Sequence, residues 1–334
     1  MAETEQQMIG RLLAPLSQGL EGAFGLKDDA AALAPPEGHE FVISMDTVTA
    51  GLHFLFDGTP KSAAMAAHKA LAVNVSDLSA KGAKPYAYFL SLSLPSGFSE
   101  WLDEFVGTLS RVQKRWGLHL AGGDTVRSHQ TLSITITVMG VVPEGQMIRR
   151  STARAGDQLF VTGTIGDAVA GLYAERFDER TETWRKILSP GEFASLASRT
   201  RTPEPRVALV PALRQFATAS LDVSDGLALD AARMAQASGL GVAIKGASVP
   251  FSSTALKLLD NTKMTLEELV TGGDDYEILA AVAPGDASAF ITRAEESQVQ
   301  VTRIGELTTR QGLVLYDAGG GRITLKKLGF EHLG

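Results

Sequence analysis

Aspartates, which have short carboxylate side chains, recur beside glycine and other small residues in five segments of the chain. They lie in the sequences GLKDDAA (Asp28 and Asp29), SMDT (Asp46), GGDT (Asp124), DVSDGL (Asp222 and Asp225) and GGDDYE (Asp274 and Asp275). Crowded carboxylates repel one another unless cations lie between them, and hard cations such as Mg2+ prefer oxygen ligands. Glycine lets the backbone approach a phosphate closely and leaves N–H groups able to bind it. The pattern therefore predicts a site for several divalent cations and a polyphosphate.

A sixth acid, Asp77, lies in a different setting. It follows Asn74 by three residues in a stretch of apolar and small residues that predicts a buried helix, so the two side chains share one helix face. A buried carboxylate costs several kcal/mol unless it is paired or bound to a metal. The sequence leaves two interpretations open, which are a metal ligand and an ion pair with Lys69 or Lys81.

Each acidic segment also has an ordinary structural interpretation. Asp28 and Asp29 fit a loop that binds its own backbone, Asp46 fits a strand-end cap, and Asp124 fits a plain turn after a strand over 118–121. His53 alone indicates no more than a structural histidine, and Arg150 is either a solvated charge or a phosphate ligand. The conjunction favours the metal and phosphate interpretation, because otherwise all the ordinary ones would have to hold together.

The common nucleotide and hydrolase fingerprints are missing from the sequence. It contains no GxxxxGK loop, no GxGxxG motif opening a helix, no HExxH and no GxSxG. There is also no cysteine, which excludes disulfides, thiolate zinc sites and a cysteine nucleophile. A phosphate site in this chain must therefore be built from metals and glycine turns.

The hydrophobic periodicity predicts the elements that position these residues. We expect a helix over 4–20, a strand over 41–48, a helix over 60–82, a strand over 86–94, a helix over 99–117, strands over 132–138 and 158–162, and helices from 167 and over 227–238. The irregular segment 143–156 predicts a boundary between two domains, 1–148 and 149–334, and the charged stretch 175–201 predicts a surface insertion. The mixture of strands and helices in both halves predicts two α/β or α+β domains.

Length and charge bound the class of protein. The 334 residues favour two domains, and the net charge of −7 argues against nonspecific nucleic-acid binding. No apolar run approaches the roughly 20 residues that span a bilayer, and the acidic N-terminus is unlike a signal peptide. We expect a soluble cytoplasmic protein whose partners include neither nucleic acid nor membrane.

The order of the motifs resembles that of the thiamine-monophosphate kinases, a family of the aminoimidazole-ribonucleotide-synthetase superfamily of ATP-using enzymes. The match runs from about 25 to 330, and KALAVNVSDLSAKGA (69–83) is its most specific part. The resemblance implies two α/β (α+β) domains, of which the N-terminal one binds ATP and Mg2+ and contributes a β-barrel at a homodimer interface. It also implies phosphorylation of thiamine monophosphate by ATP, assisted by several Mg2+ ions, to give thiamine diphosphate.

Matching motif by motif, the resemblance also implies roles for individual residues. The implied Mg2+ ligands are Asp29, Ser44, Met45 through its carbonyl, Asp46, Asp77, Asp124, Asp222 and Asp225. The implied ATP contacts are Gly123, Asp124, Arg150 and Ser224, and the implied thiamine phosphate contacts are His53, Asp274 and Phe330. The chain departs from the usual pattern at Lys27, Met45 and Asp274, where the family commonly has Gly, Thr and Glu.

The predicted chemistry requires no catalytic residue beyond the metal and phosphate ligands. The acceptor is itself a phosphate oxygen with a second pKa of about 6, so it is a nucleophile at neutral pH without a general base. Catalysis then consists of aligning two anions and neutralising charge on the transferred group, and we expect direct in-line transfer.

Two alternatives remain at this point. The first is another enzyme of the superfamily, acting on formylglycinamidine ribonucleotide or on selenide, although a selenide enzyme usually needs a reactive cysteine that this chain lacks. The second is a nucleotide- or thiamine-phosphate-binding protein without turnover. The intact acidic set argues against it, because mutually repelling carboxylates are costly to keep.

Overall fold

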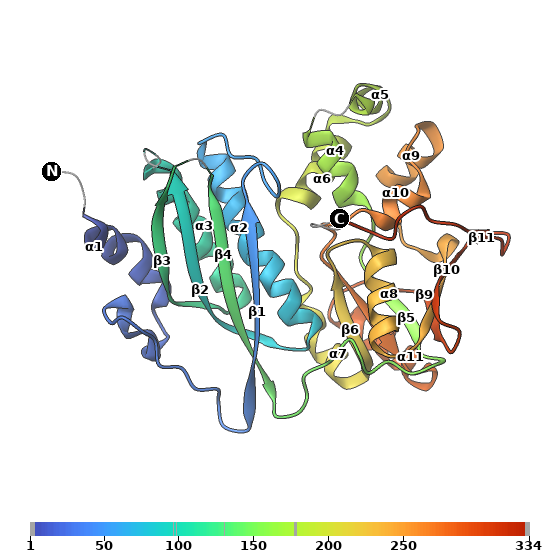
Figure 1. Ribbon diagram of the computed structural model, residues 1–334, viewed down its shortest axis with the longest axis horizontal. Helices are drawn as coiled ribbons and strands as arrows, with labels where there is room; N and C mark the ends of the chain where they lie inside the picture. The colour runs from blue at the N-terminus through green and yellow to red at the C-terminus, as the bar shows by residue number, and fades with distance from the viewer. Residues whose placement is uncertain (1–3, 96, 98, 130, 177–178, 331–334) are drawn as a thin grey trace. The chain divides into compact units, whose positions relative to one another are not determined.

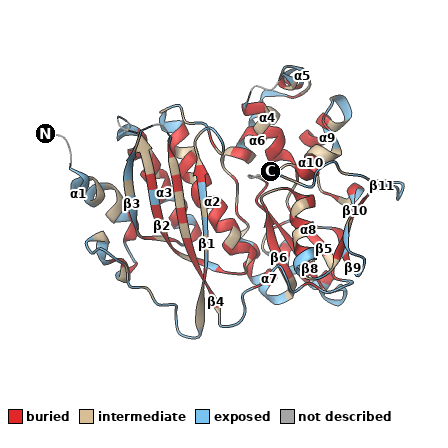
Figure 2. Cartoon of the chain, in the orientation of Figure 1, coloured by how far each residue is buried: buried red, intermediate tan, exposed pale blue. Residues whose placement is uncertain are grey.

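The chain forms two compact units, each with its own sheet. The computed structural model describes residues 4–95, 97, 99–129, 131–176 and 179–330. Unit 1 comprises residues 1–78 and 83–147, and unit 2 comprises residues 79–82 and 148–334. Figure 1 shows the strands of each sheet with their helices, and Figure 2 shows that buried residues line the strands and the helix faces packed on them.

Unit 1 is built on a mixed four-stranded sheet in the order β1-β4-β2-β3. Its strands are β1 (His39–Thr49), β4 (Ser133–Pro143), β2 (Lys84–Pro95) and β3 (His119–Ser128). β4 pairs antiparallel with both β1 and β2, and β2 pairs parallel with β3. Among the described residues β1 and β3 remain the edges, so the sheet is open and not a closed barrel.

Two long helices cover one face of this sheet (Figure 1). α2 (Pro60–Ala80) is rich in alanine and almost wholly buried, and α3 (Ser99–Trp116) buries an apolar stripe that includes Trp101 and Phe105. Both helices confirm the sequence prediction. In the described ranges no helix is long and apolar enough to cross a membrane.

The N-terminal segment is helical but not the single helix predicted over 4–20. It runs through α1 (Glu5–Met8), the π-helical turn η1 (Ile9–Leu13) and the 3-10 turns η2 (Ala14–Ser17) and η3 (Glu21–Leu26). Pro15 has no N–H to donate, so regular α-helical bonding cannot continue through it. The preceding N–H of Ala14 bonds to Ile9 O instead, which widens the turn.

The Gly122–Asp124 segment is part of a strand, whereas the sequence predicted a turn after residue 121. β3 continues to Ser128, and a register shift lies where it pairs with Tyr88 and Phe89 of β2. A Cβ atom on Gly123 would lie 1.9 Å from the backbone oxygen of Leu90. Only glycine permits this approach, so the glycines serve strand pairing here and do not end the strand.

Unit 2 is built on a seven-stranded sheet in the order β11-β10-β7-β9-β5-β8-β6. Its strands are β5 (Gln158–Thr162), β6 (Ala217–Val223), β7 (Gly241–Lys245), β8 (Glu277–Val282), β9 (Val301–Thr308), β10 (Gly312–Tyr316) and β11 (Arg322–Ile323). All neighbours pair antiparallel except β7 with β10. Leu159 and Val161 enter one apolar cluster and Phe160 another, so both faces of the sheet are covered.

The helices of unit 2 include a group that the sequence had suggested was a surface insertion. The helices are α4 (Asp167–Glu175), α5 (Arg180–Ile187), α6 (Pro190–Arg201), α7 (Val210–Phe216), α8 (Leu227–Ala237), α9 (Ser253–Asn261), α10 (Leu266–Thr271) and α11 (Ala287–Glu296). Trp184 of α5 and Leu196 of α6 are each 1% exposed and share an apolar cluster with α4, α9 and α10. The stretch 175–201 is therefore packed against the rest of unit 2 through an apolar face, which its many charged residues had not indicated.

Candidate functional site

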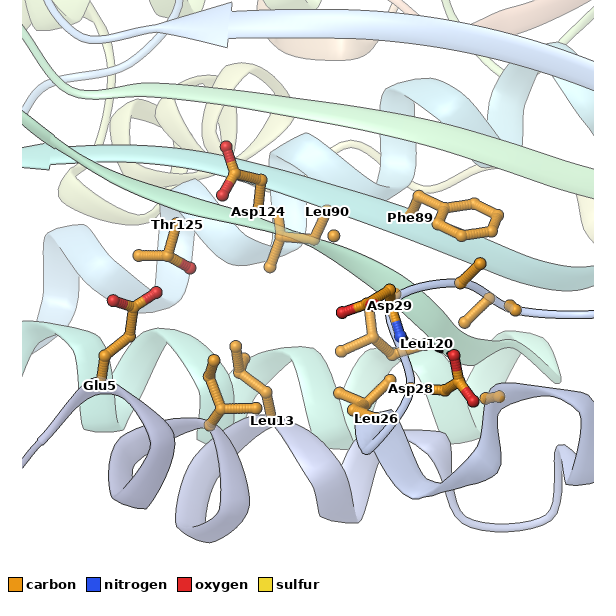
Figure 3. A pocket seen from close by; sticks show the side chains of 17 residues that line it. Glu5, Leu13, Leu26, Asp28, Asp29, Phe89, Leu90, Leu120, Asp124 and Thr125 are labelled. Atoms are coloured by element: carbon orange, nitrogen blue, oxygen red, sulfur yellow. Dashed lines mark hydrogen bonds between the residues drawn. The ribbon is translucent and has the colours of Figure 1, made fainter.

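A pocket of unit 1 brings two of the acidic segments together (Figure 3). Its volume is about 460 Å3, and it lies between the N-terminal helical segment and the edge strand β3. Asp28 and Asp29 line it together with Gly123 and Asp124, and Glu5 adds a further carboxylate. Predicted metal and ATP residues from distant parts of the sequence therefore share one space.

The acids of this pocket differ in their contacts and directions. The Asp29 N–H donates to Asp28 Oδ1 at 2.8 Å, so the loop does bind its own backbone as the ordinary interpretation expected. In Figure 3 the Asp29 side chain points into the space, whereas the Asp124 carboxylate is directed away from Asp29. The backbone contact occupies one oxygen of Asp28, whereas the Asp29 carboxylate points into the pocket.

A second group of predicted ligands lies where β1 meets α2. Ser44 and Asp46 alternate along β1 on the side that faces α2. The Ser44 hydroxyl donates to the Asp77 carboxylate, and the Asp46 N–H donates to Asn74 Oδ1 at 3.0 Å. Met45 lies on the opposite face with 63% of its surface exposed, so only its backbone can serve this group.

The loop after β1 holds His53 in a defined orientation. The Thr49 N–H donates to His53 Nδ1 at 3.0 Å, and the His53 N–H returns to Thr49 O at 2.9 Å. Because Nδ1 accepts a hydrogen bond, the proton of the neutral ring lies on Nε2. The buried Lys69 ammonium, 1% exposed, donates to the His53 carbonyl at 2.9 Å. The sequence had offered Lys69 as a possible ion-pair partner of Asp77, but it had not predicted this contact with the loop of His53.

In unit 2 the loop between β6 and α8 carries the third group. Asp222 is buried at the end of β6, and the N–H groups of Ser224 and Asp225 donate to Asp230 Oδ2 at 3.1 and 3.0 Å. Arg233 binds the carboxylates of both Asp225 and Asp230. Burial raises the pKa of Asp230 to about 6, against the lowering effect of its backbone hydrogen bonds and Arg233.

Asp230 and Arg233 were missed by sequence reasoning. They lie on the first turns of α8, where an acid is common at any helix start, so their spacing carried little signal. Their contacts show that the loop's position depends on the helix that follows it.

Two further predicted residues, Asp274 and Phe330, come to this same loop. The Asp274 N–H donates to Ser224 O at 2.8 Å, and the Phe330 N–H donates to Asp225 O at 2.9 Å. Phe330 is 45% exposed, so its ring is accessible beside the loop. The motif containing Asp274 and the C-terminal aromatic therefore lie next to the predicted metal ligands of unit 2.

A buried charge network underlies this region and was also missed. The Glu277 carboxylate is fully buried and accepts from Arg199 at 2.8 Å, Arg206 at 2.6 Å and the Thr162 hydroxyl at 2.5 Å. Burial alone would raise the pKa of Glu277, but the hydrogen bonds and charges of Arg206 and Arg199 hold it below its ordinary value. Burial raises the pKa of the neighbouring Asp275 well above its ordinary value, although Arg199 opposes this.

The described acids do not form a preformed metal cage. Within the described part of the chain, no three His, Asp or Glu side chains converge closely enough to hold an ion. Mg2+ usually keeps several waters and binds through one or two carboxylates plus substrate phosphates, so it does not require such a cage. Arg150 is exposed, and its carbonyl accepts from Ser238 Oγ at 3.2 Å; its guanidinium is not placed against the acids by any described contact.

Comparisons with known proteins agree with the motif order. Residues 27–142 match the family model "AIR synthase related protein, N-terminal domain", and residues 154–318 match "AIR synthase related protein, C-terminal domain". The thiamine-monophosphate kinase of Caulobacter vibrioides is 39% identical over 98% of this chain and 91% of its own length. That of Escherichia coli is 36% identical over 95% and 94%.

Solved structures of thiamine-monophosphate kinases are also similar to this chain. The thiamine-monophosphate kinase of Stenotrophomonas maltophilia is similar with a TM-score of 0.77 and 35% identity over 87% of this chain and 89% of its own. AaThiL, solved in complex with AMPPCP and TMP, is similar with a TM-score of 0.73 and 27% identity over 93% and 97%. Escherichia coli HypE, a hydrogenase maturation protein, shares only the fold, with a TM-score of 0.77 at 22% identity.

Proposed function

Because the chain belongs to the AIR-synthase-related family and, within it, to the thiamine-monophosphate kinases, we infer that its acidic groups serve one phosphoryl transfer. The enzyme phosphorylates thiamine monophosphate with ATP and forms thiamine diphosphate. The observation that carries this assignment is the similarity to thiamine-monophosphate kinases over 98% of the chain, which includes every acidic segment.

We propose that several Mg2+ ions assist the transfer. The residues proposed to hold them are Asp29, Ser44, the Met45 carbonyl, Asp46, Asp77, Asp124, Asp222 and Asp225. All of them offer oxygen, the donor that Mg2+ prefers, and Ser44 already contacts Asp77. When bound, the cations would supply positive charge to the phosphates beside these carboxylates.

For ATP we propose contacts from Gly123, Asp124, Arg150 and Ser224. Gly123 lies on β3 and lines the pocket, so its backbone is offered to a phosphate that enters this space. Ser224 lies on the loop that precedes the N-terminus of α8, and a helix N-terminus favours anions. The Arg150 guanidinium would donate two parallel hydrogen bonds to a phosphate.

For thiamine monophosphate we propose contacts from His53, Asp274 and Phe330. The Nε2–H of His53 is a donor suited to a phosphate oxygen, since Nδ1 is already bound to the Thr49 N–H. Asp274 offers a carboxylate to the cationic thiazolium, and the accessible Phe330 ring offers a face for stacking. Asp274 is one methylene shorter than the glutamate common in the family, so its main chain must lie closer to the substrate.

The transfer is proposed to be direct. The acceptor phosphate oxygen is already ionised near neutral pH, and no side chain in the described site is arranged as an activated nucleophile. The protein's contribution is then to align donor and acceptor and to hold the cations that neutralise their repulsion.

We also propose that residues 1–148 bind ATP and Mg2+ and form a homodimer, while residues 149–334 form the second α/β domain. The sheet face of unit 1 opposite α2 carries apolar residues exposed at 59% (Ile43), 63% (Met45) and 46% (Val126). A second copy of this face would cover them and complete a β-barrel across the interface. A cytoplasmic location stays a prediction, which cell fractionation would test.

An ADP-release assay with and without thiamine monophosphate tests the proposed function. We expect release to require both the acceptor and Mg2+, and to stop when EDTA removes the metal. Equal ATP consumption with and without the acceptor would contradict the assignment. Saturable binding of thiamine monophosphate without ADP release would indicate a non-catalytic binding protein, and release only with another acceptor would indicate a different enzyme of the superfamily.

A further inference from the structure

The segment Gly272–Glu277 has an unusual backbone. Asp274 has φ 73° and Tyr276 has φ 50°, although residues with a Cβ atom rarely adopt left-handed conformations. Such conformations persist only where the surrounding structure enforces them, and they concentrate at functional sites. The question is which contacts enforce this one.

The two glycines and two backbone hydrogen bonds fix the segment from outside. A Cβ atom on Gly272 would lie 2.4 Å from Val169 Cβ of α4, and one on Gly273 would lie 2.4 Å from Ser224 O. The Asp274 N–H donates to Ser224 O at 2.8 Å, and the Tyr276 N–H donates at 2.8 Å to the O atom of Val223, the last residue of β6. The segment is therefore joined directly to the loop that carries the proposed metal ligands of unit 2.

Asp275 fixes the segment from inside. Its side chain is 2% exposed, and its two carboxylate oxygens lie 3.1 and 3.0 Å from the Gly166 N–H that precedes α4. The Ala168 N–H adds a longer contact at 3.5 Å, and Arg199 lies close enough to act on it electrostatically. The start of α4 therefore holds the residue between the two left-handed positions.

Tyr276 acts on Asp274 itself. The Tyr276 hydroxyl donates to Asp274 Oδ1 at 3.1 Å, and only 9% of Tyr276 is exposed. The contact joins the two residues that have left-handed backbone conformations. One oxygen of the Asp274 carboxylate is thus oriented by a neighbour that is itself packed in place.

We infer that Asp275 and Tyr276 are positioning residues that set the place and direction of the Asp274 carboxylate for the thiamine phosphate acceptor. This inference rests on the proposed function, in which Asp274 contacts that substrate. It goes further by dividing the GGDDYE motif into parts. Asp274 faces the ligand, Asp275 anchors the segment to α4, and Tyr276 orients the carboxylate.

The test compares Tyr276→Phe and Asp275→Asn with a matched control, Asp157→Asn. Asp157 is also a buried acid of unit 2, 3% exposed, and accepts from the Arg154 N–H at 2.8 Å and the Thr218 hydroxyl at 2.6 Å. Each variant is measured for KM toward each substrate, kcat, melting temperature, and the Kd of thiamine monophosphate by calorimetry.

We expect Tyr276→Phe to raise KM and Kd for thiamine monophosphate by about threefold to tenfold, the size of one lost hydrogen bond. KM for ATP and the melting temperature should stay near wild type. Asp275→Asn should raise the same KM by about tenfold or more, since it loosens the whole segment, and should lower the melting temperature. Asp157→Asn should lower the melting temperature and leave both KM values unchanged.

The inference is overturned if Tyr276→Phe leaves KM and Kd for thiamine monophosphate within twofold of wild type, or if either variant raises both KM values equally. If Asp275→Asn does not fold, the double variant Asp274→Asn/Tyr276→Phe decides. Positioning predicts that it binds no worse than Asp274→Asn alone, and additive losses would contradict it. Because Kd is measured without turnover, an inactive wild-type enzyme would count against the proposed function and leave this test intact.

Discussion

The acidic side chains of the two units are held in different ways. In unit 1, Ser44 and Asp46 lie on a regular strand and Asp77 lies on a regular helix; the Ser44 hydroxyl donates to the Asp77 carboxylate, and the Asp46 N–H donates to Asn74 Oδ1. In unit 2, Asp225 and Asp274 lie on irregular segments supported by charged groups, namely the Asp230–Arg233 pair and the buried network around Glu277. Regular elements fix side-chain direction through the backbone alone, whereas irregular ones need additional contacts.

Because of this difference, we expect loss of a carboxylate to lower mainly the activity in unit 1 and mainly the stability in unit 2. Removing a carboxylate charge from unit 1 removes a proposed metal ligand and the repulsion that this charge exerts on other carboxylates. Removing one from the network of unit 2 leaves buried charges unpaired, which is costly. Loss of a carboxylate charge should therefore lower the stability of unit 2 but not that of unit 1.

The largest expected effect is in unit 2. Glu277→Ala leaves Arg199 and Arg206 without their shared carboxylate, and we expect a loss of about 3–5 kcal/mol in the free energy of unfolding. Hydrogen exchange followed by mass spectrometry during urea unfolding measures the protection of backbone amides in each unit separately. Protection should fall first in β5, β8 and α6. Equal loss of protection in unit 1 would show that the network does not act locally.

Next in size is the loss of activity in unit 1. Asp46→Asn and Asp77→Asn should each lower kcat by about 100-fold or more, the scale on which one electrostatic group acts in a transition state. The melting temperature of the metal-free protein should stay equal or rise, because a crowded charge is gone. Asp103→Asn, a surface acid paired with Arg11, is the control for charge removal. A metal-free melting temperature several degrees lower in both variants would indicate a structural ion-pair role.

A smaller effect tests the close approach of β3 to β2. Gly123→Ala places a Cβ atom 1.9 Å from Leu90 O, and we expect a loss of about 1–3 kcal/mol in stability with a higher KM for ATP. Gly122→Ala is the matched control, because its Cβ meets only the Phe89 ring, at 3.2 Å. If the two variants behave alike, backbone approach is not what this position requires.

The smallest effect on the fold is expected on the open face of the unit 1 sheet. Ile43 is 59% exposed there, so Ile43→Lys should leave the melting temperature of a monomer unchanged. If this face joins two copies, the charge should shift the protein toward monomer in sedimentation experiments at micromolar concentration. Thr135→Lys, on the neighbouring strand of the same face, provides an independent check. A dimer that survives both changes would place the interface elsewhere.

Much of the fold was predictable where one periodicity dominates. The alternation through Ile134, Ile136 and Val138 predicted β4, and the alanine-rich run after Pro60 predicted α2 with Asn74 beside Asp77. The N-terminal helix was predicted as continuous, because a single proline within a good apolar pattern was given too little weight. Gly122 and Gly123 were interpreted as a turn, since nothing local distinguishes a turn glycine from one that lets strands approach closely.

The residues of the site could be predicted from the sequence, but the residues that hold them in place could not. The motifs pointed to Asp225 and Asp274, which the structure brings to one loop. The partners that hold this loop and the GGDDYE segment were not predictable, because Arg199 and Arg206 reach Glu277 from 78 and 71 positions away. Such pairings have no local signature, and charged residues in a helix usually indicate a solvated face.

The central claim is that these acids act by holding cations and phosphates for a single direct transfer, with no side chain as nucleophile. The most direct measurement uses ATP made chiral at the γ-phosphorus with thiamine monophosphate as acceptor. One in-line transfer inverts the configuration at phosphorus, and we predict inversion. Retention would require two successive transfers through a phosphorylated side chain and would contradict the account.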